Sequence, residues 1–188
     1  MKSKVIISAV ALALLSASVI CAADSMEEKQ AKIRKGVAEA LQDLYKLQPS
    51  AQGAIQKAAG YAVFKNFGTN LLVVSTASGK GIATNNQTKQ DTFMKMISAG
   101  AGLGVGVKDF RVIFVFESDK AYKQFLDSGW SGSAQGDAAA KAGSSGGAVS
   151  GAVEVAPDVY VYQITKNGLA LQLTLQGTKY YKDDDLNK

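Results

Sequence analysis

Two glycine-rich stretches carry the residue types that most suggest chemistry, namely the binding of a nucleotide phosphate. The segment SGKG at 78–81 sets a lysine between glycines. A P-loop needs Ser or Thr after that lysine and a glycine six residues before it, but here Gly81 follows Lys80 and position 74 is valine. The second stretch, GAGLGVG at 100–106, fits G-x-G-x-x-G in no register. Neither stretch therefore predicts a nucleotide site.

Acidic and nucleophilic residues offer little more. The run DDD at 183–185 could bind a divalent cation weakly, but such a run is more often a solvated tail. Histidine is absent, which excludes a Ser-His-Asp triad and the commonest ligand of transition metals. The other carboxylates considered stand singly, at Asp109, Asp127, Asp137 and Glu154. The sequence therefore predicts a protein that is not an enzyme and that uses no metal or cofactor.

Residues 1–23 have the pattern of a secretory signal peptide. Lys2 and Lys4 precede an apolar run that is short for a membrane-spanning helix, and small residues follow it up to Ala23. We expect cleavage after Ala23, which leaves a single domain at 24–188 without cysteine and a periplasmic or secreted location. A lipoprotein anchored through Cys21 is the less favoured alternative, because Ile20 is large for that cut.

The helical part of the domain is expected at 24–59. The segment 25–48 has the period of an amphipathic helix, with an apolar stripe that includes Ile33, Val37 and Leu44. Its polar face carries Lys29, Lys32, Arg34 and Lys35. Such a helix can dock on a sheet with its charges solvated, which the residues favour, or lie at a lipid surface. The net charge of +5 for the whole chain is mildly basic and favours anionic partners.

From residue 61 onward the period is that of β-strands. We expect strands at 61–64, 70–77, 100–107, 111–116, 158–165 and 169–177. The segment 91–98 fits a strand or a helix and favours a strand, and 146–156 resumes the alternation typical of strands. A turn that leads into another strand is expected at 78–84, a loop at 85–90, a short helix at 118–129 and a polar tail from 179. These elements predict an α+β fold, in which N-terminal helices pack on a curved, mostly antiparallel β-sheet or partial barrel with one inserted short helix.

Glycine at positions 100, 102, 104 and 106 would leave one face of a strand without side chains. A bare face allows another backbone, a helix or an acyl chain to approach closely. We expect the N-terminal helices to cover it at rest. If that cover moved, a groove would open to lipid.

Several motifs occur in the order found in the SYLF domain family, and the chain resembles its secreted bacterial branch from about Ala58 to the end. They are AAGYAVFKNFG (58–68), GKGIA (79–83), FMKMISAGAGLGVGVKDFRVIFVFES (93–118), FLDSGW (125–130), DAAAKAG (137–143), GGAVSGAVEVAP (146–157) and NGLALQLTLQGTKYY (167–181). Two departures are Lys65, where many members have proline, and NNQTKQDTFMKM in place of the eukaryotic GGWSxP segment. The resemblance implies lipid binding without catalysis, chiefly of phosphoinositides, with the amphipathic N-terminal helix taking part.

For a bacterial envelope protein, this resemblance implies an anionic phospholipid such as phosphatidylglycerol or cardiolipin. Binding of actin is not expected, nor is binding of nucleic acid. The residues expected to contact lipid head groups are all cations: Lys29, Lys32, Arg34 and Lys35, then Lys57, Lys65 and Lys80. The alternative is an envelope protein-interaction or structural module, anchored by Trp130 unless that side chain packs in the core. A hydrolase is a third and weaker alternative.

Overall fold

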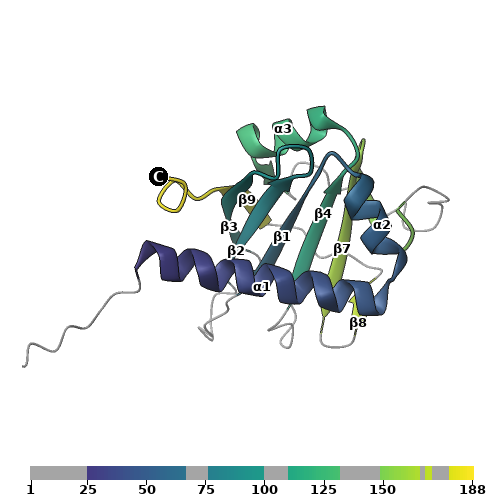
Figure 1. The fold of residues 1–188 in the computed structure, drawn as a ribbon, viewed down its shortest axis with the longest axis horizontal. Helices are drawn as coiled ribbons and strands as arrows, with labels where there is room; N and C mark the ends of the chain where they lie inside the picture. The colour runs from purple at the N-terminus through teal and green to yellow at the C-terminus, as the bar shows by residue number, and fades with distance from the viewer. Residues whose placement is uncertain (1–24, 67–75, 100–109, 132–148, 166–167, 171–177) are drawn as a thin grey trace, which may run out of the picture.

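The computed structural model describes residues 25–66, 76–99, 110–131, 149–165, 168–170 and 178–188. Within these ranges, nine strands form one antiparallel sheet that curls into a half-barrel, with helices on both of its faces (Figure 1). This is the α+β architecture that the sequence predicts.

The elements follow one another along the chain with a helical start and one helix between strands. The helices are α1 (Met26–Leu47), α2 (Ser50–Lys57) and α3 (Asp119–Ser128). The strands are β1 (Gly60–Asn66), β2 (Thr76–Asn85), β3 (Asp91–Ala99), β4 (Arg111–Phe116), β5 (Trp130–Ser131), β6 (Val153–Ala156), β7 (Val159–Thr165), β8 (Gly168–Ala170) and β9 (Thr178–Lys182). Their order across the sheet is β5-β9-β3-β2-β1-β4-β7-β6, and β8 pairs with β7.

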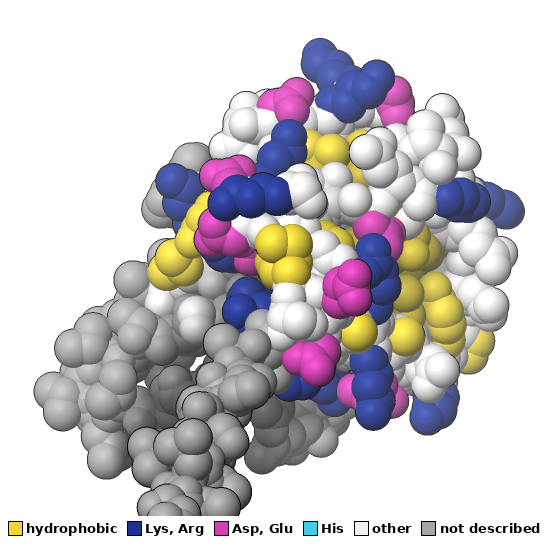
Figure 2. Space-filling view, turned by 60° about the vertical axis from the view of Figure 1, so that its left-hand side comes forward, with side chains coloured by type: hydrophobic (Ala, Val, Ile, Leu, Met, Phe, Trp, Pro, Cys, Tyr) yellow, Lys and Arg dark blue, Asp and Glu magenta, His cyan; other side chains and the backbone are white. Residues whose placement is uncertain are grey.

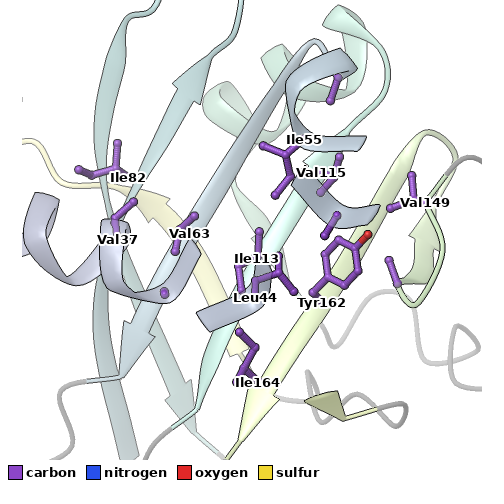
Figure 3. Close-up of a cluster of buried hydrophobic side chains, with 14 of the residues drawn as sticks. Val37, Leu44, Ile55, Val63, Ile82, Ile113, Val115, Val149, Tyr162 and Ile164 are labelled. Carbon is purple, nitrogen blue, oxygen red and sulfur yellow. The ribbon is translucent and has the colours of Figure 1, made fainter. Parts of the chain in front are cut away.

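Helix α1 lies across the strands and covers one face of the sheet (Figure 1). It starts at a capping box, in which Ser25 Oγ accepts from the Glu28 N–H and the Glu28 carboxylate accepts from the Ser25 N–H. Its buried stripe includes Val37 and Leu44, which point at the side chains of β1, β2 and β4 (Figure 3). The predicted helix at 25–48 is confirmed, and so is its docking through the apolar stripe.

The opposite face of the sheet carries a core of aromatic rings under α3. Phe64, Phe114 and Tyr180 lie with ring centroids 4.6–6.0 Å apart, and Phe125 of α3 packs on them. Trp130 joins this cluster, 5.7 Å from Phe114 and 5.8 Å from Tyr180. Trp130 is therefore partly buried and packed against this aromatic cluster, which disfavours its role as a surface anchor.

Two expectations for the strands are wrong. The segment SGKG does not form a turn, because β2 runs through it and pairs with both β1 and β3. The C-terminal part is not a free polar tail, because Thr178–Lys182 is strand β9 and pairs with β3. In both places the backbone hydrogen bonds of a neighbouring strand outweigh a composition that is typical of loops.

Several expectations lie outside the described residues. These are the signal peptide at 1–23 with Cys21, most of the strand at 70–77, the alternating glycines at 100–106, the motif at 137–143 and most of the strand at 169–177. None of the described helices is both long enough and apolar enough to cross a membrane.

Gly81 lies in β2 where that strand passes close to β1. A Cβ atom there would overlap the Val63 carbonyl oxygen and come within 2.6 Å of the Phe64 ring. We therefore expect Gly81→Ala to lower the free energy of unfolding by ~1–3 kcal/mol, as overpacking does. Urea unfolding followed by circular dichroism would measure the change.

The matched control is Gly53→Ala in α2, where a Cβ would meet nothing within 4 Å. An alanine in an exposed helix position should raise stability by up to ~1 kcal/mol. Equal effects of the two changes would contradict the close approach of β1 to β2 at Gly81.

Candidate functional site

All four predicted head-group cations of α1 are exposed, and three of them are lysines. Lys29, Lys32 and Lys35 follow one another at intervals of three residues, and each is open to solvent. The helix displays them because its apolar stripe, from Ile33 to Leu44, is turned to the sheet. We call Lys29, Lys32 and Lys35 the helix lysines.

The fourth predicted cation of α1, Arg34, contacts two side chains of β3. Arg34 Nε lies 3.4 Å from Asp91 Oδ2, and the guanidinium lies 4.8 Å from the centroid of the Phe93 ring. Arg34 therefore holds α1 against β3. Lys57, the last residue of α2, is exposed.

Four further cations lie side by side across the sheet. In the strand register, Lys65 pairs with Arg111 on one side and with Lys80 on the other, and Lys80 pairs with Lys95. Directly paired residues of antiparallel strands share a face. We call Arg111, Lys65, Lys80 and Lys95 the cation row; it crosses β4, β1, β2 and β3.

The cation row lies on the face that α1 covers. Each cation stands two residues from an apolar side chain buried under α1, and alternate residues of a strand point to the same side. These apolar neighbours are Ile113, Val63, Ile82 and Phe93, in the order of the row. The row therefore runs parallel to α1, next to the apolar contact.

Helix α1 supplies counter-ions to one half of the row. Glu39 Oε2 lies 3.0 Å from Lys65 Nζ, and Asp43 Oδ2 lies 3.2 Å from Arg111 Nη1. The two carboxylates are one helical turn apart and so lie on the same flank of α1. The hydrogen bond and the positive charge of Lys65 hold the pKa of Glu39 below its usual value.

The other half of the row is neutralised by the C-terminal segment. The Asp183 side chain is 1% exposed; its Oδ1 lies 2.8 Å from Lys95 Nζ, and its Oδ2 lies 3.5 Å from Lys80 Nζ. Hydrogen bonds from Lys95 to Asp183 and Asp185 raise the pKa of Lys95. The first residue of the DDD run is therefore a buried counter-ion, and the expectation of a solvated run is wrong for it.

Side-chain and backbone hydrogen bonds fix this segment in place. Asn187 Nδ2 donates to the Phe93 carbonyl oxygen at 2.8 Å, and Asn187 Oδ1 accepts from the Phe93 N–H at 2.8 Å. Gln30 of α1 donates to the Leu186 carbonyl oxygen at 2.9 Å, and Leu186 is buried in the core under α1. The start of α1 and the C-terminal segment therefore hold each other against β3.

The resulting surface has mixed charge. Figure 2 shows lysine and arginine side chains interspersed with aspartate and glutamate on the face it displays. Within the described ranges no three His, Cys, Asp or Glu side chains gather as a metal site would require. The chemistry that this arrangement offers is reversible binding of anions by cations that already have internal counter-ions.

The structure brings Lys65 and Lys80 of the predicted set into the cation row and leaves Lys29, Lys32, Lys35 and Lys57 outside it. Sequence reasoning missed Lys95, Arg111 and the two carboxylates Glu39 and Asp43, and it assigned Asp183 to a solvated run. The only signal was that each row cation stands two residues from an apolar core position. Without the strand register, that signal does not place the cations next to one another.

Residues 97–188 match the model of the Ysc84 family, which is described as "Las17-binding protein actin regulator". The C-terminal half of the chain therefore carries a Ysc84-type domain. Ysc84 and SYLF are names for the same domain, so the resemblance read from the sequence motifs is confirmed. The family is one of binding domains and not a known enzyme family, and membership suggests binding related to lipid or actin.

A curated relative is "Beta cell expansion factor A" of Aeromonas veronii. It is 33% identical over 149 residues, which are 79% of this chain and 55% of that protein. The chain therefore spans about half the length of this relative.

Asp183 offers a direct test of how the C-terminal segment is held. Asp183→Asn keeps the shape of the side chain but removes the charge that Lys80 and Lys95 face. We expect the free energy of unfolding to fall by ~1.5–3 kcal/mol, the worth of a hydrogen bond to a charged group. Asp184→Asn, at an exposed neighbour, should change it by less than ~0.5 kcal/mol. Equal stability of the two variants would show that the buried carboxylate does not hold the segment.

Proposed function

We propose that this protein binds anionic phospholipid, or an anionic membrane surface, without catalysis, and that the helix lysines make the first contact. The observation that carries the proposal is the exposure of Lys29, Lys32 and Lys35 on a helix whose apolar stripe is already docked. The docked stripe fixes the helix, so the three ammonium groups are presented together without a conformational change. Membership of a family with lipid- or actin-related binding supports this reading.

The expected strength follows from the number of cations. A lysine close to an anionic membrane contributes ~1 kcal/mol, so three contribute ~3 kcal/mol in low salt. Salt weakens the attraction, since the screening length is ~8–10 Å at 0.10–0.15 M. Lys57 can add a further contact from α2. Arg34 is already bound to Asp91 and contributes chiefly to docking α1.

We expect binding to anionic vesicles that salt weakens, and ten- to hundredfold weaker binding after Lys29, Lys32 and Lys35 are all changed to glutamine. Co-sedimentation of the purified chain with phosphatidylglycerol/phosphatidylcholine vesicles, and with phosphatidylcholine alone, would measure it.

The matched control changes three exposed lysines elsewhere, with Lys89→Asn in the β2–β3 turn and Lys120→Gln and Lys123→Gln on α3. It removes the same charge and should bind nearly as the wild type does. Equal binding to neutral and anionic vesicles would contradict the proposal. Absence of binding by the wild type would favour the alternative, an envelope protein-interaction module, although Trp130 is not free to anchor it.

We further propose that the protein works in the periplasm or outside the cell, which makes phosphatidylglycerol or cardiolipin the native lipid. The support is the signal-like pattern of residues 1–23. Mass spectrometry of the native protein should find Asp24 as its first residue. A first residue at Met1 would contradict secretion, and a lipid-modified Cys21 would instead show an anchored form.

A further inference from the structure

The cation row is a second group of positive charges, separate from the helix lysines. We propose that it is the site at which the phosphate groups of anionic lipids bind, and that Glu39 and Asp43 of α1 occupy that site in this structure as internal counter-ions. This inference rests on the proposed function, because it takes the ligand to be an anionic lipid.

The arrangement of like charges is the first argument. Cations directly opposite each other on neighbouring strands repel and destabilise a sheet, whereas paired opposite charges stabilise it. Here the four residues of the row are all cations, and every counter-ion comes from outside the sheet, from α1 or from the C-terminal segment. The row spans three strand spacings, ~14 Å, which is wide enough for several phosphate oxygens. A sheet that only needed stability would gain from alternating signs.

The contacts of Arg111 are the second argument. Asp43 approaches Arg111 through Nη1, while Arg111 Nε is buried and has no hydrogen-bond partner among the described residues. A guanidinium binds carboxylate or phosphate best through two parallel N–H donors. The Asp43 contact thus leaves a donor unused that a phosphate with more oxygens could engage after a small shift of the side chain.

Access and exchange are the third argument. The side chains of the row remain 27–40% exposed, so a head group can reach them while α1 stays docked. The Glu39 and Asp43 side chains are 45% and 37% exposed, and ion pairs of this kind contribute only ~0–1 kcal/mol. A membrane phosphate can therefore replace either carboxylate at small cost.

The neighbours of the row favour a lipid over free phosphate. Ile97 lies two residues beyond Lys95 on the same strand and face, and it is 46% exposed. Tyr181 pairs directly with Lys95, and the ammonium group of Lys179 lies over the Tyr181 ring. An exposed apolar side chain and a partly exposed tyrosine beside cations suit the boundary between head groups and acyl chains.

The decisive variant is Glu39→Gln with Asp43→Asn, which frees Lys65 and Arg111 without changing either cation. We expect it to bind phosphatidylglycerol vesicles about tenfold more tightly than the wild type, and phosphatidylcholine vesicles no better. The control is Glu117→Gln with Asp158→Asn, which changes two exposed carboxylates away from the row. Glu117 directly follows β4 and lies ~20 Å from Arg111, the first residue of that strand. It makes the same change in net charge and should raise affinity much less. Equal gains in the two variants would overturn the inference.

A second variant excludes loosening of α1 as the cause. Adding Lys65→Gln and Arg111→Gln to Glu39→Gln and Asp43→Asn restores the net charge of the wild type and leaves the same flank of α1 unpaired. If the row binds the phosphates, the gain should disappear. If it persists in a chain whose circular dichroism is native, the gain comes from α1 and the inference is wrong.

Two further outcomes keep the proposals apart. In the first outcome, the wild type binds anionic vesicles through the helix lysines, but the Glu39→Gln, Asp43→Asn variant gains no more affinity than its control. That outcome would overturn this inference and leave the proposed function standing. Failure of every folded variant to bind would overturn both.

Inorganic phosphate, compared with chloride at equal ionic strength, should compete only weakly with vesicles. Full competition would mean a site for soluble phosphate instead of lipid.

Discussion

The contact between the apolar stripe of α1 and the sheet is the interaction on which the other features of this domain depend. Fully burying one Ile, Val or Leu side chain contributes ~1.5–3 kcal/mol, and the stripe buries Ile33, Val37 and Leu44. The ion pairs beside it contribute ~0–1 kcal/mol each. The apolar contact therefore docks the helix, and the ion pairs of Glu39 and Asp43 lie beside that contact. Both the display of the helix lysines and the masking of the cation row follow from that docking.

The charge arrangement is a consequence of the same geometry. Four neighbouring cations on a sheet are tolerated because two separate segments bring carboxylates to them. One of these segments is part of the helix, and the other is the C-terminal turn that buries Asp183. The two halves of the row thus differ, since partly exposed carboxylates cover Lys65 and Arg111 while a buried one lies between Lys80 and Lys95. Ligands can compete with the first pair far more easily than with the second.

The sequence predicts much of the fold because its signals are local. The period of 25–48 and the apolar run of β4 each determine an element without help from distant residues. So does the N-cap of α3, at which Ser118 Oγ accepts from the Ala121 N–H. The prediction of a turn at SGKG is wrong because Gly81 serves the close approach of β2 to β1, a tertiary cause that composition does not reveal. The C-terminal segment was misjudged for the same reason, since the value of Asp183 and Asn187 depends on β3 lying next to them.

The candidate site was harder to predict than the fold. The exposure of Lys29, Lys32 and Lys35 follows from helix periodicity. The commitment of Arg34 to Asp91 and Phe93 does not, because these residues lie far along the chain. The cation row depends on the register of three strand pairs, and a shift of one residue in any of them would place its cations on opposite faces of the sheet.

The hydrogen bond from Gln30 to Leu186 joins residues 156 positions apart in the sequence. Strand β9 lies between β3 and β5 in the sheet, and the segment after it contributes Leu186 to the core under α1. Non-local pairing of this kind slows folding, because the chain loses the entropy of closing a long loop before the new contacts can offset that loss. On the ribosome, the first helix would therefore emerge long before its final partner. Until β9 and the segment that contains Leu186 have been synthesised, the apolar stripe of α1 would have only an incomplete surface to cover.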